Sequence, residues 1–136
     1  MLAFAPLVQH GISHFACILP GCCAGHYSSW GIYNIVSGDT RFPLQPIEAI
    51  GAWIIVGILL YRLKQKSYQP DGLEYPIMLV LFGSSRFVFE FLRDNEKIWL
   101  GCSSLSFHAL FMLIVGAVWL VHIRRKSIQT AQPIQE

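Results

Sequence analysis

The chain has 136 residues and a net charge of +2, and 54% of its residues are hydrophobic while only 13% are charged. Soluble domains usually contain about 25% charged residues, so this composition indicates a membrane protein and one compact unit. The net charge is too small to suggest a nucleic-acid-binding protein, and no basic run is interleaved with aromatic residues.

The first apolar segment covers residues 2–20 and is interrupted by polar residues such as Gln9 and His14. It predicts a short membrane helix that ends near Pro20. No basic segment precedes it, so a cleavable signal peptide is not expected. Residues 21–43 are rich in glycine and serine and carry aromatic residues of the kind found at membrane–water interfaces. We expect an outward-facing loop or re-entrant segment there.

Three longer apolar segments follow, over residues 44–61, 73–92 and 105–121. Each is close to the roughly 20 residues that a helix needs to cross a bilayer. A tight turn over residues 67–72 separates the first two of them. The predicted fold is all-α, a polytopic membrane protein with about four transmembrane helices in a single domain over residues 1–126.

Basic residues cluster directly after the second and fourth predicted helices: Arg62, Lys64 and Lys66, and then Arg124, Arg125 and Lys126. Because positively charged loops stay on the cytoplasmic side, we expect both clusters and both termini to be cytoplasmic. Residues 127–136 would then form a polar cytoplasmic tail. The loops over residues 21–43 and 93–104 would face outward, beside the end of the third helix.

The third predicted helix carries Arg86, Glu90 and Arg93 at spacings of four and three, which place them on one face. A charge at the centre of a membrane helix costs roughly 2.5–3.5 kcal/mol on insertion scales, so it rarely lacks a role. Two interpretations stay open. The group is either a structural ion pair between helices, or a cationic site for a lipid phosphate in which Glu90 holds Arg86. Glu48 is either an interfacial acid or the partner of an arginine on this helix.

Cysteines and histidines surround the first outward turn: His14, Cys17, Cys22, Cys23 and His26. Imidazole and thiolate are good metal ligands, which makes a metal or redox centre one hypothesis. The spacing H-x-x-C-x-x-x-x-C-C-x-x-H matches no familiar zinc pattern, and adjacent cysteines rarely share one ion. We therefore favour small buried cysteines that pack at a helix end, with no metal and no cofactor.

Three segments resemble the prolipoprotein diacylglyceryl transferase family. The most specific is the late signature Phe82-x-x-x-Arg86-Phe87-x-x-Glu90-Phe91-x-Arg93. The other two are Gly21-Cys22-Cys23-Ala24-Gly25 and Pro43-x-Gln45-x-x-Glu48. They occur in the family's order, and the resemblance covers residues 10–123.

The resemblance implies a transferase of lipoprotein biosynthesis in the bacterial cytoplasmic (inner) membrane. Such an enzyme moves the diacylglyceryl group of phosphatidylglycerol to the lipobox cysteine thiol of a preprolipoprotein. By motif matching, Arg86 corresponds to an arginine that contacts the lipid headgroup, and His14 takes the place of a second arginine. These two are the expected catalytic residues. The expected substrate-binding residues are Arg86, Glu90, Arg93, Gly25, Gln45 and Glu48.

The chain also departs from the family pattern. Phe42, Ile47 and Phe82 stand where members have histidine, tyrosine and tyrosine. Full-length members have several earlier spans, and whether a partner subunit or a second copy of this chain supplies them is left open by the sequence. These departures favour the alternative function, a non-catalytic membrane protein derived from the family that binds a lipid or a partner.

Overall fold

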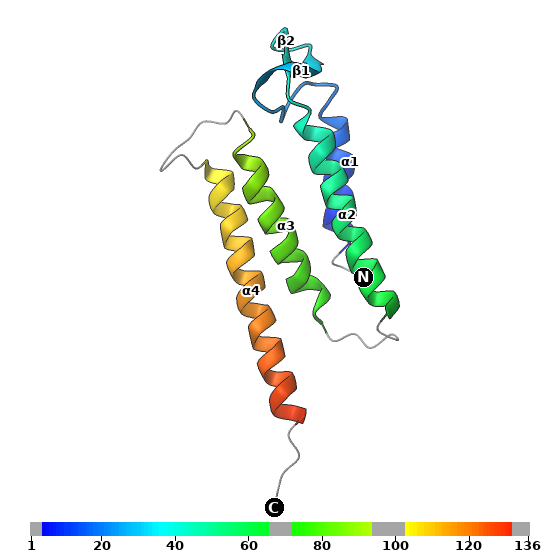
Figure 1. Ribbon diagram of the computed structural model, residues 1–136, viewed down its shortest axis with the longest axis vertical. Helices are drawn as coiled ribbons and strands as arrows, with labels where there is room; N and C mark the ends of the chain where they lie inside the picture. Colours follow the sequence, from blue (N-terminus) through cyan, green and yellow to red (C-terminus); the bar gives the residue numbers. More distant parts are fainter. Residues whose placement is uncertain (1–3, 66–71, 94–102, 132–136) are drawn as a thin grey trace, which may run out of the picture.

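The computed structural model describes residues 4–65, 72–93 and 103–131. This part of the chain is mostly helical, as predicted, and its helices are α1 (Ala5–Ala16), α2 (Leu44–Gln65), α3 (Glu74–Glu90) and α4 (Ser104–Ala131). They lie side by side with a β-hairpin at one end (Figure 1). α1 packs against α2, α2 contacts α3, and α3 packs along α4.

Two of the described helices are long and apolar enough to cross a membrane, over Leu44–Gln65 and Ser104–Ser127. α1 has 12 residues and α3 has 17, so both are shorter than the roughly 20 residues that a perpendicular span needs. Two candidate spans are therefore established by length and composition. The prediction of about four spans stays an expectation for α1 and α3.

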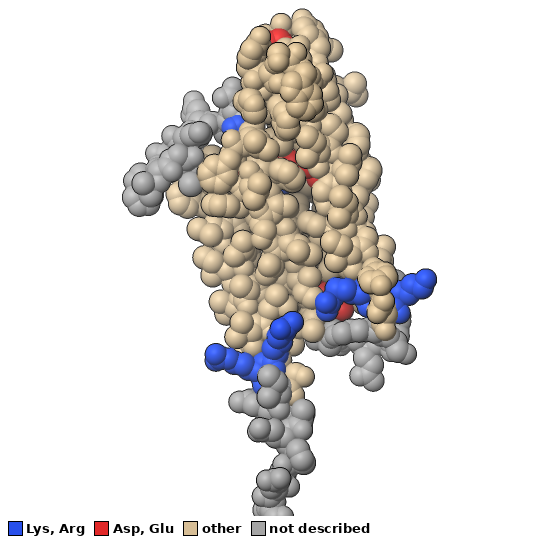
Figure 2. All heavy atoms as spheres, viewed as in Figure 1, with Lys and Arg blue, Asp and Glu red and all other residues tan. Residues whose placement is uncertain are grey.

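Large apolar side chains cover the outer face of α4 instead of being enclosed by protein. Phe111 is 67% exposed and Val118 is 64% exposed, and Ile54 on α2 is 57% exposed. An apolar face of this length is a liability in water but suits the hydrocarbon core of a bilayer. Figure 2 shows most of the visible Lys and Arg gathered opposite the hairpin, where α2 and α4 end, with a mostly uncharged surface between.

A β-hairpin occupies most of the segment that the sequence predicts as a loop. Strand β1 (Tyr27–Asn34) pairs antiparallel with strand β2 (Asp39–Arg41). The loop prediction for residues 21–43 is wrong for these two strands. β1 is mostly exposed and all of β2 is half-buried, so the strands lack the alternation of buried and exposed positions by which a strand is recognised in a sequence.

The turn of the hairpin is built by Asn34 and Gly38. The Asn34 side-chain oxygen accepts hydrogen bonds from the backbone N–H groups of Val36 and Ser37, and Gly38 N–H donates to Asn34 O at 2.9 Å. Gly38 adopts a φ of +71°, which a residue with a Cβ rarely tolerates. Just beyond the turn, hydrogen bonds from Arg41 lower the pKa of Asp39, so this pair stays ionised at the hairpin tip.

The apolar core and the buried polar residues occupy different halves of the helical layer. The core cluster lies towards the end opposite the hairpin and consists of Leu7, Ile55, Leu59, Met78 and Leu79. The buried charged and polar side chains lie near the hairpin, where α1 and α3 end and α2 and α4 begin; they include His14, Gln45, Glu48, Glu90, Arg93, Ser103 and Ser106. The polar site therefore lies between the helix ends near the hairpin, and the apolar core cluster fills the opposite half of the helical layer.

Gly83 sets the close approach of α3 to α4. A Cβ at this position would lie 3.0 Å from both Ala109 O and Leu113 N, which are backbone atoms of α4 that cannot rotate away. Small residues allow helix backbones to approach closely, and this packing is a main stabilising contact between membrane helices.

The substitution Gly83→Leu is therefore expected to lower the free energy of unfolding by about 1–3 kcal/mol, because it overpacks the α3–α4 contact. Unfolding in mixed detergent micelles, followed by circular dichroism, would measure the loss. Gly57→Leu is the matched control, since no atom lies within 4 Å of a Cβ built at Gly57. Equal losses of unfolding free energy in the two variants would show that the close contact of α3 with α4 at Gly83 does not stabilise the fold.

Candidate functional site

The carboxylate of Glu48 lies at the centre of a buried cluster that joins α1, α2 and the end of α3. Glu48 is 2% exposed. Arg86 Nη1 donates to Glu48 Oε2 at 2.9 Å, and Arg93 Nη2 lies 2.7 Å from both carboxylate oxygens. His14 Nδ1 lies 2.8 Å from Oε2. Of the two interpretations of Glu48, pairing with an arginine of the third helix is therefore the one found.

Each side chain of this cluster comes from a helix end near the hairpin. His14 is in the last turn of α1, and Glu48 is in the second turn of α2. Arg86 is in the last turns of α3, but α3 ends at Glu90, so Arg93 reaches Glu48 from the turn that follows. The prediction that one helical face carries all three charged residues holds for Arg86 and Glu90 and is wrong for Arg93.

The cluster carries an excess of positive charge at Glu48, because two arginines contact this one carboxylate. The Arg93 side chain is 5% exposed, and the Arg86 side chain is 16% exposed. Buried ions must be paired because removing them from water is costly, and Glu48 offsets that cost for both guanidinium groups. Arg86 is consequently the arginine that a molecule outside the cluster can reach more easily.

The 2.8 Å contact of His14 Nδ1 with Glu48 Oε2 is an ion-pair contact without hydrogen-bond geometry. Two further buried nitrogen atoms near the cluster, Arg93 Nε and His10 Nε2, have no hydrogen-bond partner among the described residues. The His10 ring lies 4.2 Å from the His14 ring and makes an edge contact with Phe82 at 4.9 Å between centroids. Buried polar atoms are usually satisfied by protein or water, so such atoms beside a cationic cluster point to a ligand or ordered water. His10 was not among the predicted site residues, although its spacing of four from His14 places both on one helical face.

Glu90 lies at the end of α3 and was predicted to hold Arg86. The structure shows a hydrogen bond from the Arg86 guanidinium to Glu48. Glu90 is 6% exposed and accepts a hydrogen bond from the Ser103 hydroxyl at 2.6 Å. This bond ties the end of α3 to the residue that precedes α4. A substrate-binding role for Glu90 stays a prediction.

Gly25 and Gln45 hold the backbone around the cluster. Gly25 N–H donates to Phe42 O at 3.2 Å, and Gly25 also forms a β-bridge with Arg93. A Cβ on Gly25 would lie 2.9 Å from Phe42 Cβ, so the close approach requires glycine. Gln45 Nε2 donates to Cys22 O at 2.9 Å. These contacts position the segments near Arg93, and substrate binding by Gly25 or Gln45 stays a prediction.

The ligand atoms of His10, His14 and Glu48 lie within 4.8 Å of one another, which is close enough for a metal ion. However, the Glu48 carboxylate already accepts hydrogen bonds from Arg86 and Arg93. A cation placed there would meet two like charges at close range and would compete with them for one carboxylate. The electrostatics of the cluster favour an anion.

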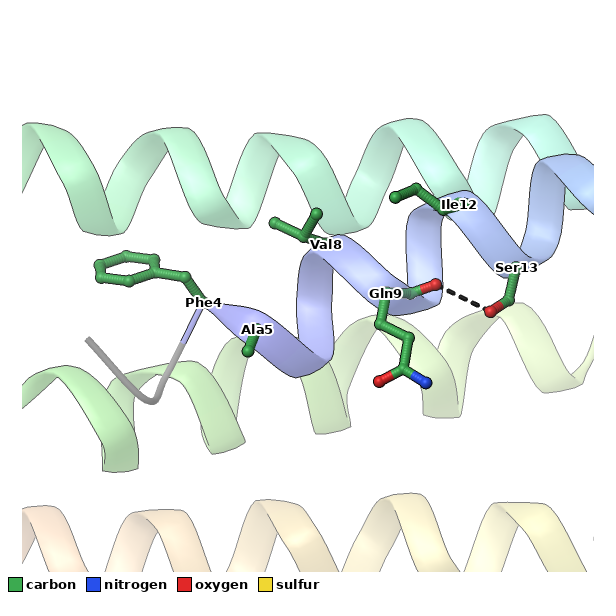
Figure 3. A pocket seen from close by; sticks show the side chains of 6 residues that line it. All are labelled: Phe4, Ala5, Val8, Gln9, Ile12 and Ser13. Carbon is green, nitrogen blue, oxygen red and sulfur yellow. Dashed lines mark hydrogen bonds between the residues drawn. The ribbon is translucent and has the colours of Figure 1, made fainter.

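A hollow on the outer face of α1 is a second candidate site and is lined by Phe4, Ala5, Val8, Gln9, Ile12 and Ser13 (Figure 3). The Ser13 hydroxyl donates to Gln9 O at 2.8 Å, so its hydrogen is already used within the helix. The lining has no charged group and is largely apolar. Such a surface suits a hydrocarbon chain but offers no recognition of a polar headgroup, so the Glu48 cluster is the stronger candidate.

The chain is similar to known proteins over most of its length. The family model for prolipoprotein diacylglyceryl transferase matches residues 1–122. A phosphatidylglycerol–prolipoprotein diacylglyceryl transferase of Dehalococcoides mccartyi is 25% identical over 130 residues, which cover 91% of this chain and 50% of the relative. One from Streptococcus pyogenes is 28% identical over 95 residues, which cover 68% of this chain and 36% of the relative.

The chain thus spans about half the length of the D. mccartyi relative that it matches. No solved structure matches it at a comparable level of significance. The family match covers the segments that supply His14, Glu48, Arg86 and Arg93 to the buried cluster. The chain belongs to the prolipoprotein diacylglyceryl transferase family.

Proposed function

We propose that the cluster around Glu48 binds the phosphate of phosphatidylglycerol, and that the chain transfers the diacylglyceryl group to the lipobox cysteine of a preprolipoprotein. The observation that carries this proposal is the convergence of Arg86, Arg93 and His14 on one buried carboxylate. The names of the relatives support it, since they state that those proteins use phosphatidylglycerol and prolipoprotein.

Arginine is suited to this role because its planar guanidinium can donate two parallel hydrogen bonds to a phosphate. Glu48 holds Arg86 and Arg93 in place before a lipid arrives, so the charges need little rearrangement on binding. Arg86 is the more exposed of the two and would contact the headgroup first. The unpartnered Arg93 Nε offers a further donor inside the cluster.

In the proposed reaction, the cysteine sulfur attacks the glyceryl carbon next to the phosphate oxygen. A C–S bond forms, the C–O bond breaks, and glycerol phosphate leaves with the electron pair, while the thiol proton passes to the leaving phosphate. Arg86 would stabilise the negative charge on the leaving phosphate. Removal of one such donor typically slows a reaction about 10²- to 10³-fold. His14 would add positive charge to the same phosphate when it is protonated.

The direct test uses the purified chain in proteoliposomes with phosphatidylglycerol and a lipobox peptide, and it measures the thioether product by mass spectrometry. We expect product above the background of the Arg86→Ala variant. An equal yield from the wild type and this variant would overturn the catalytic proposal. Binding of phosphatidylglycerol is measured separately, so that loss of transfer and loss of the lipid site can be told apart.

A second candidate function is lipid binding without transfer, and the ring of Phe82 favours it. Phe82 makes an edge contact with His10 but brings no hydroxyl group to the cluster. Expression of the chain in cells that lack their own transferase separates the two functions. Restored lipoprotein processing would support the transferase, whereas lipid binding without restored processing would support the binding protein.

We further propose that all four described helices lie in the membrane with the hairpin outside and the basic ends of α2 and α4 in the cytoplasm. The gathering of basic residues opposite the hairpin supports this orientation (Figure 2). Cys22 is exposed on the hairpin side. In a variant that keeps Cys22 as its single cysteine, a membrane-impermeant maleimide should label intact spheroplasts. Labelling that requires permeabilised cells would reverse the orientation.

A further inference from the structure

Three cysteine thiols come together at the turn between α1 and the hairpin. The sulfur atoms of Cys17, Cys22 and Cys23 all lie within 4.8 Å of one another, and all three cysteines are free. Cys22 is exposed, while Cys17 and Cys23 are half-buried. The prediction that these cysteines are buried packing residues is therefore wrong for Cys22.

The backbone conformation explains how two adjacent cysteines can share a site with Cys17. Gly21 has a φ of +68° and Cys23 has a φ of +58°, so the chain turns sharply on both sides of Cys22. A left-handed conformation costs a residue with a Cβ roughly 1–2 kcal/mol. Adjacent side chains that would diverge in an extended segment are gathered by this turn. The sequence argument against a shared ion, that adjacent cysteines rarely bind one, does not hold for this geometry.

Side chains from two other elements fix the turn. Asn34 Nδ2, at the end of β1, donates to Gly21 O at 2.8 Å, and Gln45 Nε2, on α2, donates to Cys22 O at 2.9 Å. Asn34 and Gln45 are themselves buried. The positions of Cys22 and Cys23 are thus set by the surrounding fold and do not depend on a bound ion.

We propose that Cys17, Cys22 and Cys23 bind one thiophilic metal ion, Zn²⁺ or Cu⁺, through three thiolate ligands. Zn–S bonds of about 2.3 Å place tetrahedral sulfur ligands about 3.8 Å apart, which small side-chain rotations can reach from the present arrangement. Sulfur ligands favour Zn²⁺ and Cu⁺ over Mg²⁺ or Ca²⁺. The exposure of Cys22 gives an ion access from solvent.

The test uses the full chain, purified in detergent under reducing conditions and incubated separately with Zn²⁺ and with Cu⁺. After desalting, elemental analysis should give one bound ion per chain, and competition with a chromophoric chelator should give its affinity. Each of the variants Cys17→Ser, Cys22→Ser and Cys23→Ser should lose at least about 100-fold in affinity, since loss of an outer partner alone costs 10–100-fold. Cys102→Ser is the matched control and should bind like the wild type.

A further variant, Gln45→Leu, keeps all three thiols but removes the hydrogen bond to Cys22 O. It should lower the metal affinity about 10-fold, the lower end of the effect of supporting contacts. Circular dichroism must show that every variant keeps the helical content of the wild type. In the protein loaded with Cd²⁺, thiolate absorption in the ultraviolet reports sulfur ligation directly. The proposal is overturned if no stoichiometric ion binds, if Cys102→Ser loses affinity equally, or if the thiols only form a disulfide. The readouts do not depend on diacylglyceryl transfer.

Discussion

The substitution Glu48→Gln is expected to lower the free energy of unfolding by about 3–5 kcal/mol, the usual cost of removing one partner from a buried ion pair. Glu48 is the carboxylate that both Arg86 and Arg93 contact, and its side chain is 1% exposed. Without it, two buried guanidinium groups lie close together and lose a shared counter-charge. Unfolding in detergent, followed by circular dichroism, would measure the loss.

Glu74→Gln provides the control for this prediction. Glu74 is an acid in the first turn of α3 and is not part of the buried cluster, so its loss should cost less than about 1 kcal/mol. A bound anion should also compensate for the missing carboxylate, because ligand binding to the native state adds stability. Glycerol phosphate is therefore expected to stabilise Glu48→Gln more than the wild type. Similar losses for Glu48→Gln and Glu74→Gln would mean that the cluster does not hold the helices together.

Arg86→Ala is expected to lower the affinity for phosphatidylglycerol about 10- to 100-fold, since a hydrogen bond to a charged group contributes about 1.5–3 kcal/mol. Arg86→Lys should give an intermediate affinity, because lysine keeps the charge but lacks the planar pair of donors. Titration of phosphatidylglycerol into mixed micelles, followed by native mass spectrometry, would measure these affinities.

Arg41→Ala is the matched control for this substitution. Arg41 lies in the hairpin and pairs with Asp39 at 3.0 Å, outside the Glu48 cluster. We expect its loss to leave the lipid affinity unchanged. If Arg41→Ala weakens binding as much as Arg86→Ala does, the attraction is a general effect of positive charge and the proposed headgroup site is wrong.

The sequence predicts α2, α3 and α4 well because each is a long apolar segment that ends in polar or basic residues, and it predicts α1 as a shorter one. It also predicts Arg86 as a site residue, since an arginine in an apolar helix must find a partner. It fails at the hairpin, because β1 is mostly exposed and β2 has only three residues, all half-buried, so neither strand shows a periodic pattern. Asn34 and Gly38, which build the turn, are recognisable only as turn-forming residues.

The partner of Arg86 could not be fixed from the sequence alone. Glu90 lies one helical turn away and is the natural choice from spacing, whereas Glu48 lies 38 positions away along the chain. The contact with Glu48 depends on how α2 and α3 pack, and no local pattern encodes that packing. The sequence raised a metal site at the cysteines as one hypothesis but disfavoured it for a similar reason, because the positive φ of Cys23 is a property of the folded turn.

The most direct test of the Glu48 cluster as a phosphate site compares phosphatidylglycerol with a diacylglycerol that has the same acyl chains but no phosphate. The measurement is the thermal unfolding temperature of the wild-type chain in micelles that contain one lipid or the other. The cluster predicts that phosphatidylglycerol raises this temperature, that diacylglycerol does not, and that Arg86→Ala abolishes the difference. Equal stabilisation by the two lipids would contradict the central claim, because recognition would then rest on the acyl chains alone.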